Sequence, residues 1–223
     1  MKLSLNILRD IFFLKYMKTF WKNIKINKFI FNNYDYLVNN LNCKYVWKCD
    51  QKFINKLYEK NITYNHLEIG PGTGYFLRNY KFDNLHLIDI NDDVLNNCKK
   101  NLKSNCQNIH LYNKNIFEIN NKINKEITSI GLSYVLHCVP NNLDSSLNNL
   151  VENVKTGNKI IIFGSTVIPN KNDYLAMTEI YFLNKFGIFN NMNHNKNQLE
   201  NIVKKYNGNI KQIGNVLIFD FTL

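Results

Sequence analysis

The hydrophobic positions beyond residue 62 form two alternating patterns. Short apolar runs predict five β-strands, at residues 66–69, 85–89, 108–112, 127–132 and 159–163. Residues 94–102 and 143–154 instead place their apolar side chains at helical spacing. Strands that alternate with helices pair in parallel through right-handed crossovers. The pattern therefore predicts an α/β fold built on a doubly wound, mostly parallel sheet.

The end of the sequence has a different pattern. Two apolar runs, at residues 210–213 and 216–221, are separated only by Gly214 and Asn215, a connection that suits a tight hairpin. We therefore expect the parallel sheet to finish in an antiparallel C-terminal hairpin. Residues 171–189 are rich in aromatic side chains and are predicted to be helical, so they serve either the core or a substrate lid.

Residues 1–33 are predicted to form a separate N-terminal extension, followed by one domain over residues 34–223. Apolar side chains recur at helical spacing between Leu3 and Leu14, which predicts an amphipathic helix. Charged residues such as Arg9 and Lys15 interrupt the apolar stretch well before the ~18 residues that a membrane span needs. The helix is expected to cap the following domain, or alternatively to lie on a membrane surface.

The formal net charge of +11 raises the question of a nucleic-acid partner, because Lys and Arg neutralise phosphates. The Lys residues are scattered, however, and no run of five or six like charges occurs. Asn, Lys and Ile are abundant, as in chains encoded by AT-rich genomes. We therefore interpret the charge as a diffusely basic surface and disfavour a dedicated nucleic-acid surface.

The five cysteines show neither a CxxC pair nor a histidine at zinc-finger spacing. They are Cys43, Cys49, Cys98, Cys106 and Cys138. We therefore expect no metal site. An odd number of cysteines without a secretory signal indicates reduced thiols, and hence a cytoplasmic protein.

The segment EIGPGTG, residues 68–74, follows the first predicted strand and is expected to lead into a helix. Glycines there let the chain turn sharply and approach a ligand without a Cβ clash. Asp89, at the end of the next strand, can accept hydrogen bonds from both hydroxyls of a ribose. The segment lacks the GxGxxG spacing that seats a pyrophosphate, and Glu68 would repel one. A carboxylate at this position suits a ligand that carries an ammonium and a sulfonium.

These features resemble the class I S-adenosylmethionine-dependent methyltransferases over about residues 34–223. The stretch LEIGPGTGYF, residues 67–76, looks like their first motif, Asp89 matches their ribose-binding acidic residue, and residues 155–158 resemble the turn into their fifth strand. The resemblance implies a Rossmann-like sheet, S-adenosylmethionine as cofactor and S-adenosylhomocysteine as product. Asn115 stands where the family usually has an acidic residue near the adenine amine, and its carbonyl can still accept that bond. The cofactor-binding residues expected from the resemblance are Glu68, Gly70, Gly72, Gly74, Tyr75, Asp89, Ile90, Asn115, Ile116 and Ser133.

Residues 130–140 look like the fourth strand of the family and the loop that follows it, and they hold the candidate catalytic residues. His137 is the candidate general base, with a structural histidine bonded to the backbone as the alternative. Tyr134 is expected to flank the methyl group or the acceptor. Trp47, Phe186 and Phe189 are expected to form either an apolar lid or part of the core.

The acceptor is expected to be a small molecule, methylated on oxygen or carbon, since the chain looks similar to natural-product enzymes of the family. The fourth strand lacks the (Asn/Asp/Ser)-Pro-Pro-(Tyr/Phe) turn of enzymes that methylate exocyclic base amines, and no Pro-Cys nucleophile is present. Two alternatives stay open: an RNA or protein methyltransferase, and a non-catalytic cofactor-binding partner protein. The sequence leaves the oligomeric state undetermined.

Overall fold

The computed structural model describes residues 42–120, 122–123, 126–140, 142–154 and 158–223, so the predicted N-terminal extension lies outside the described residues. A seven-stranded sheet in the order β3-β2-β1-β4-β5-β7-β6 forms the centre of the domain. Its strands are β1 Asn65–Ile69, β2 Phe82–Asp89, β3 Cys106–Asn113, β4 Ser129–Ser133, β5 Ile161–Val167, β6 Asn209–Ile213 and β7 Val216–Thr222. Strands β1 to β5 run parallel, whereas β7 pairs antiparallel with both β5 and β6. The predicted α/β sheet with its antiparallel C-terminal hairpin is confirmed.

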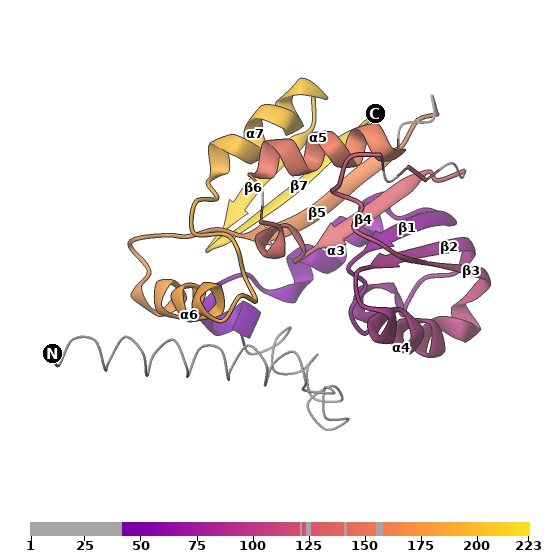
Figure 1. Ribbon diagram of the computed structural model, residues 1–223, viewed down its shortest axis with the longest axis horizontal. Coiled ribbons are helices and arrows are strands. Elements are labelled where there is room, and N and C mark those ends of the chain that lie inside the picture. Colours follow the sequence, from indigo (N-terminus) through magenta and orange to yellow (C-terminus); the bar gives the residue numbers. More distant parts are fainter. Residues whose placement is uncertain (1–41, 121, 124–125, 141, 155–157) are drawn as a thin grey trace, which may run out of the picture.

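Helices cover both faces of this sheet (Figure 1). They are α3 Gln51–Asn61, α4 Asp92–Leu102, α5 Leu143–Val154, α6 Tyr174–Lys185 and α7 Lys196–Lys205. Helices α5 and α7 bury leucines such as Leu147 and Leu199 against one face, together with Leu67 and Ile69 of β1. Helices α3 and α4 cover the other face. Because side chains alternate along a strand, His66 and Glu68 point toward α3 and α4.

One prediction about the elements needs correction. The glycine segment leads into a single 3₁₀ turn, Tyr75–Leu77, rather than into a full helix. Helix α7 was not predicted. Helix α3, before β1, was not predicted either, and it begins at the capping side chain of Asp50. The helix predicted within residues 171–189 is confirmed as α6.

Candidate functional site

The carboxyl ends of β1, β2 and β4 are neighbours, because β4 joins the sheet on the side of β1 opposite to β2. In open α/β sheets ligands bind at this edge, where the order of the strands reverses. The predicted site residues follow these strand ends: the glycine segment follows β1, Asp89 ends β2, and Ser133 ends β4. The fold therefore brings together residues that lie far apart in the sequence.

The glycine segment forms a tight turn that only glycine adopts easily. Gly70, Gly72 and Gly74 have φ angles of 63°, 54° and 79°, all in the left-handed region. A Cβ at Gly70 would lie 2.6 Å from Val135, and one at Gly74 would lie 3.0 Å from Leu102. A Cβ at Gly72 would meet nothing within 4 Å. A residue with a side chain would therefore be strained at all three positions and crowded at Gly70 and Gly74, whereas Gly72 keeps an open side that a ligand can approach.

Asp89 ends β2 beside this turn, and Ile90 follows it. The amide of Gly70 donates to the carbonyl of Ile88, 2.9 Å away, and so ties the turn to the end of β2. Asp89 accepts a hydrogen bond from the amide of Asn91 at 2.8 Å, and partial burial raises the pKa of its carboxyl. The side chain of Ile90 is 75% exposed. A carboxylate next to an exposed apolar side chain matches a nucleoside, which has a polar ribose and a flat apolar base.

Asn115 and Ile116 follow β3 and are held by local contacts. The Oδ1 atom of Asn115 accepts from the amide of Phe117 at 3.1 Å, and its Nδ2 donates to Glu118 at 3.2 Å. Ile116 is buried in the core beside α5. Its side chain therefore faces away from solvent, and any cofactor contact would come from its backbone. The adenine contact of Asn115 stays a prediction.

Glu68 lies beneath the glycine turn and is almost fully buried. Its Oε1 accepts from the hydroxyl of Tyr58 at 2.6 Å, and its Oε2 lies 2.8 Å from Nε2 of His66. Both carboxylate oxygens thus have partners within the protein. The direct cofactor contact predicted for Glu68 stays a prediction, while its partners show how the carboxylate is held.

Ser133 and Tyr134 lie where β4 ends. Tyr134 has a φ of 60°, and its amide donates to the carbonyl of Ser165 at 2.8 Å. Its ring lies near Trp47 and Phe76, with ring centroids 5.4 and 6.4 Å away. Burial raises the pKa of Tyr134 well above its usual range, so its hydroxyl stays protonated.

His137 is buried in the short 3₁₀ turn Leu136–Cys138 that follows β4. Its Nδ1 accepts from the amide of Val167 at 3.4 Å. Burial lowers the pKa of His137 to about 3, and the neighbouring His194 adds to this effect. Between the two roles considered for His137, these features favour the neutral, backbone-bonded histidine over the general base.

An aromatic cluster packs around His137. The Phe189 ring lies 4.1 Å from the His137 ring and the Trp47 ring 6.1 Å from it, measured between centroids. Trp47 and Phe189 are buried, so both belong to the core, whereas Phe186 is half-buried and stacks on Phe182. Of the three aromatic residues considered for a lid, two therefore lie in the core and the third, Phe186, is half-buried.

Glu179 of α6 is a residue of this region that the sequence pattern did not reveal. Its Oε2 accepts from the indole Nε1 of Trp47 at 2.7 Å, and burial raises the pKa of its carboxyl. The two residues are 132 positions apart, so no local motif could have connected them. Cys138, which follows His137, is exposed.

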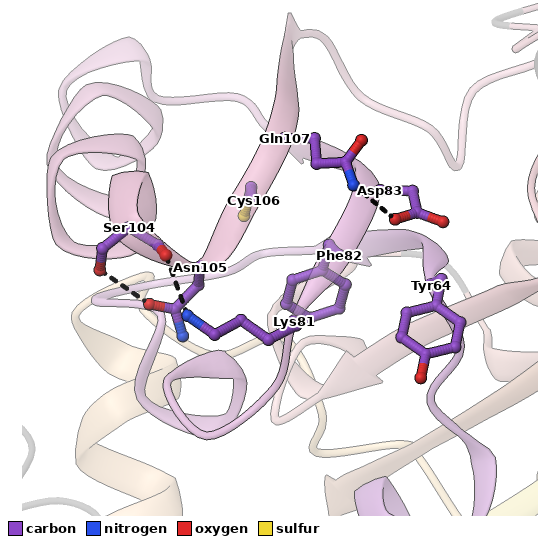
Figure 2. A pocket seen from close by; sticks show the side chains of 8 residues that line it. All are labelled: Tyr64, Lys81, Phe82, Asp83, Ser104, Asn105, Cys106 and Gln107. Atoms are coloured by element: carbon purple, nitrogen blue, oxygen red, sulfur yellow. Dashed lines mark hydrogen bonds between the residues drawn. The ribbon is translucent and has the colours of Figure 1, made fainter.

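A separate hollow of about 250 Å³ lies at the opposite edge of the sheet, where β2 and β3 begin (Figure 2). Lys81 donates to the carbonyl of Ser104 at 3.0 Å, and Gln107 donates to Asp83 at 3.1 Å. Its polar groups thus bond to one another. We assign no role to this hollow in cofactor binding, because it lies at the amino ends of the strands. Among the described residues no group of His, Cys, Asp and Glu is arranged to hold a metal ion, and no helix is both long and apolar enough to cross a membrane.

Comparison with known proteins finds relatives of which several are named methyltransferases. The chain is 29% identical over 188 residues to the demethylluteothin O-methyltransferase of Streptomyces thioluteus, with 80% of each chain covered. It is 27% identical over 210 residues to methyltransferase aurB of Calcarisporium arbuscula, covering 83% of this chain and 90% of the relative. No protein-family model matches the chain.

A solved structure has the same fold. The SAM dependent methyltransferase from Aquifex aeolicus superposes with a TM-score of 0.50 and 13% identity, covering 83% of this chain and 93% of that one. Its similarity agrees with the mostly parallel sheet and the antiparallel strands at its end. The chain is thus similar in sequence to methyltransferases and shares the fold of an S-adenosylmethionine-dependent methyltransferase.

Proposed function

We propose that the protein transfers a methyl group from S-adenosylmethionine to an oxygen or carbon atom of a small molecule. The observation that carries the proposal is the left-handed glycine turn, open at Gly72, beside the carboxylate of Asp89. The names of the relatives support a small acceptor, since one is an O-methyltransferase named for demethylluteothin. The cytoplasmic location inferred from the cysteines belongs to the same proposal.

Each residue at the strand ends would hold a different part of the cofactor. Asp89 would accept the ribose hydroxyls, Ile90 would cover one face of the adenine, and Gly72 would let the chain approach the ligand closely. Tyr75 begins the 3₁₀ turn and would border the same space, and Ser133 and Tyr134 would flank the methyl end. When bound, the cofactor supplies an electrophilic methyl group on a sulfonium.

The protein's own contribution is mainly to orient the acceptor and exclude water. An in-line displacement of a good leaving group depends on alignment, for which well-oriented pairs gain roughly 7–11 kcal/mol. The half-buried ring of Tyr134, backed by the buried rings of Trp47 and Phe189, would provide a fixed apolar wall at the end of β4. Neutral His137 lies behind them and supports this wall, which is the role that its low pKa favours.

Titration calorimetry with S-adenosylhomocysteine tests the cofactor site. We expect micromolar binding by the wild type and a loss of at least tenfold in affinity for Asp89→Asn, because the ribose loses a charged acceptor. Asp92→Asn is the matched control. It removes the same charge, but from an exposed carboxylate of α4. An Asp89→Asn protein that binds like the wild type would exclude the ribose assignment.

A labelled-methyl assay then tests the acceptor class. Small phenols and enols are offered to the wild type with methyl-labelled S-adenosylmethionine, beside a pool of RNA and a pool of proteins. We expect the label in the small-molecule fraction. Label found only in RNA or protein would replace the proposed acceptor, and cofactor binding without any transfer would favour the non-catalytic partner protein.

A further inference from the structure

Helix α6 is apolar on two opposite faces. One face buries Ala176 and Ile180 in the domain. The other face carries four large apolar side chains, each between 48% and 85% exposed, which are Tyr174, Leu175, Tyr181 and Phe182. Their spacing of seven residues, from 174 to 181 and from 175 to 182, places them in one row along the helix. We call these four residues the α6 stripe.

A surface helix normally presents charged or polar side chains on its outer face. Helix α4 does so, since it exposes Asp92, Lys99 and Lys100. A helix that is apolar on both faces is instead normally covered on both by protein. The exposed fractions show that no described element covers the α6 stripe. The stripe is therefore a surface that fits an apolar partner.

The described part of the chain begins beside α6. The indole Nε1 of Trp47 donates to Oε2 of Glu179, in the middle of α6, at 2.7 Å. Burial raises the pKa of Glu179, and hydrogen bonds from Trp47 and Asn42 act against this effect. The amide of Trp47 donates to the carbonyl of Asn42 at 3.0 Å, so the two residues belong to one turn (Figure 1). Residues 1–41, which lie outside the described residues, are thus joined to the domain next to α6.

The sequence of this preceding segment matches the α6 stripe in chemistry and length. Its predicted amphipathic helix places aliphatic side chains on one face, namely Leu3, Ile7, Leu8, Ile11 and Leu14. At 1.5 Å per residue, residues 3–14 would span about 18 Å as a helix, which is also about the length of α6, Tyr174–Lys185. Residues 15–41 would bridge roughly 40 Å even at the helical rise, so the connection is long enough to allow contact.

We propose that the aliphatic face of residues 3–14 docks on the α6 stripe of the same chain. Covalent attachment keeps the segment at an effective concentration on the order of millimolar, so a modest apolar contact is enough to hold it. Docking would also stabilise α6, whose Glu179 holds Trp47 against the ring of Tyr134, 5.4 Å away between centroids. The N-terminal segment would thereby support the proposed acceptor wall from behind.

Hydrogen–deuterium exchange of the full chain, followed on peptides that cover α6, tests the contact. Ile7→Lys puts a charge on the aliphatic face, whereas Asn6→Lys adds the same charge on another face and is the matched control. We expect the α6 amides to exchange on the order of tenfold faster in Ile7→Lys and at the wild-type rate in Asn6→Lys. Exchange in β1 and β4 should be the same in all three proteins. Wild-type exchange of α6 in Ile7→Lys would overturn the inference.

Phe182→Lys tests the same contact from the side of α6. We expect it to accelerate exchange as Ile7→Lys does, and the double variant to exchange no faster than either single variant, because one contact cannot be lost twice. Effects that multiply in the double variant would show two independent surfaces and overturn the inference. Should Phe182→Lys fail to fold, Tyr174→Lys replaces it, since Tyr174 is the most exposed member of the stripe.

Two other occupants of the α6 stripe are excluded by separate measurements on the same proteins. A second copy of the chain would make sedimentation of the wild type depend on concentration, and Phe182→Lys but not Ile7→Lys would abolish this dependence. A membrane surface would make the wild type, but not Phe182→Lys, co-sediment with vesicles of anionic phospholipid. We expect neither result, and either one, combined with unchanged α6 exchange in Ile7→Lys, would replace the N-terminal segment as the partner.

Discussion

Tyr134 is one of four described residues other than glycine whose φ angle is positive. A φ of 60° is uncommon for any residue with a side chain and costs on the order of 1–3 kcal/mol. The hydrogen bond to Ser165 and the ring of Trp47 offset that cost. Strained residues of this kind gather at functional sites, and Tyr134 lies where the methyl end of the cofactor is expected. Nothing in the sequence reveals the strain, because the tertiary contacts impose it.

His137 gives a prediction at the same scale. Its folded-state pKa of about 3 lies below the ordinary 6.5, so the unfolded chain binds more protons between these values. The free energy of unfolding should therefore fall as the pH decreases from 7, and His137 should account for about 2 kcal/mol of this fall at pH 5. Urea unfolding of wild type and His137→Gln at several pH values isolates this contribution. We expect the variant to lose it, and parallel pH curves for the two proteins would contradict a buried neutral His137.

Some site residues could be predicted from the sequence and others could not. Gly70 and Asp89 could be predicted because they belong to a local sequence pattern. In this pattern a glycine turn follows one strand and a carboxylate ends the next strand. Tyr58 and Glu179 act through partners that the fold brings near, at separations of 10 and 132 residues. Side chains whose role depends on such partners leave no periodic signal.

At the scale of elements, the strength of the apolar pattern decided what could be predicted. Helix α5 has the bounds predicted for it, because leucines such as Leu143 and Leu147 repeat on one face. Helix α7 buries only Leu199, Ile202 and Val203, and its capping pair is Asn195 with Gln198, a weaker signal. The helix expected after the glycine turn is absent, because β2 begins at Phe82, three residues earlier than predicted, and leaves too little chain.

Asp173 joins three elements at the start of α6, which predicts its effect on stability. It accepts from the amide of Ala176, forms an ion pair with Lys48 at 2.7 Å, and accepts from Asn215 at 2.8 Å. The hydrogen bonds from Lys48 and Asn215 lower the pKa of Asp173 to about 2. Its stabilising effect is therefore complete above the ordinary value of 3.8 and is lost as the pH falls through 2.

We expect Asp173→Ala to reduce the free energy of unfolding by about 2 kcal/mol at neutral pH. Asp50→Ala is the control, because Asp50 also caps a helix but, among the described residues, its carboxylate accepts only from the amide of Lys52, so its loss should be smaller. Chemical denaturation of both variants measures the difference. Equal losses would show that the contacts of Asp173 with Lys48 and Asn215 add nothing to its capping of α6.

At the scale of the whole molecule, cofactor binding should stabilise the fold. The proposed site is built from the ends of β1, β2 and β4, which belong to the central sheet and exist only in the folded chain. S-adenosylhomocysteine at a hundred times its dissociation constant should add about 2.7 kcal/mol to the free energy of unfolding. Thermal melts with and without the ligand measure this, and Asp89→Asn, with an affinity about tenfold weaker, should gain only about 1.4 kcal/mol at the same concentration. A ligand-independent melting temperature in the wild type would contradict the proposed site.

The position of β7 has a consequence for how the chain folds during its synthesis. β7 lies between β5 and β6 in the sheet, although it follows both in the sequence. While the ribosome is still adding residues 216–222, β6 has no neighbour and one edge of β5 is open. The parallel half of the sheet, with its glycine turn and Asp89, has by then been translated and can form first. The nascent chain would thus expose an unpaired, aggregation-prone strand edge until residue 222 leaves the exit tunnel. A chaperone would be needed during that interval.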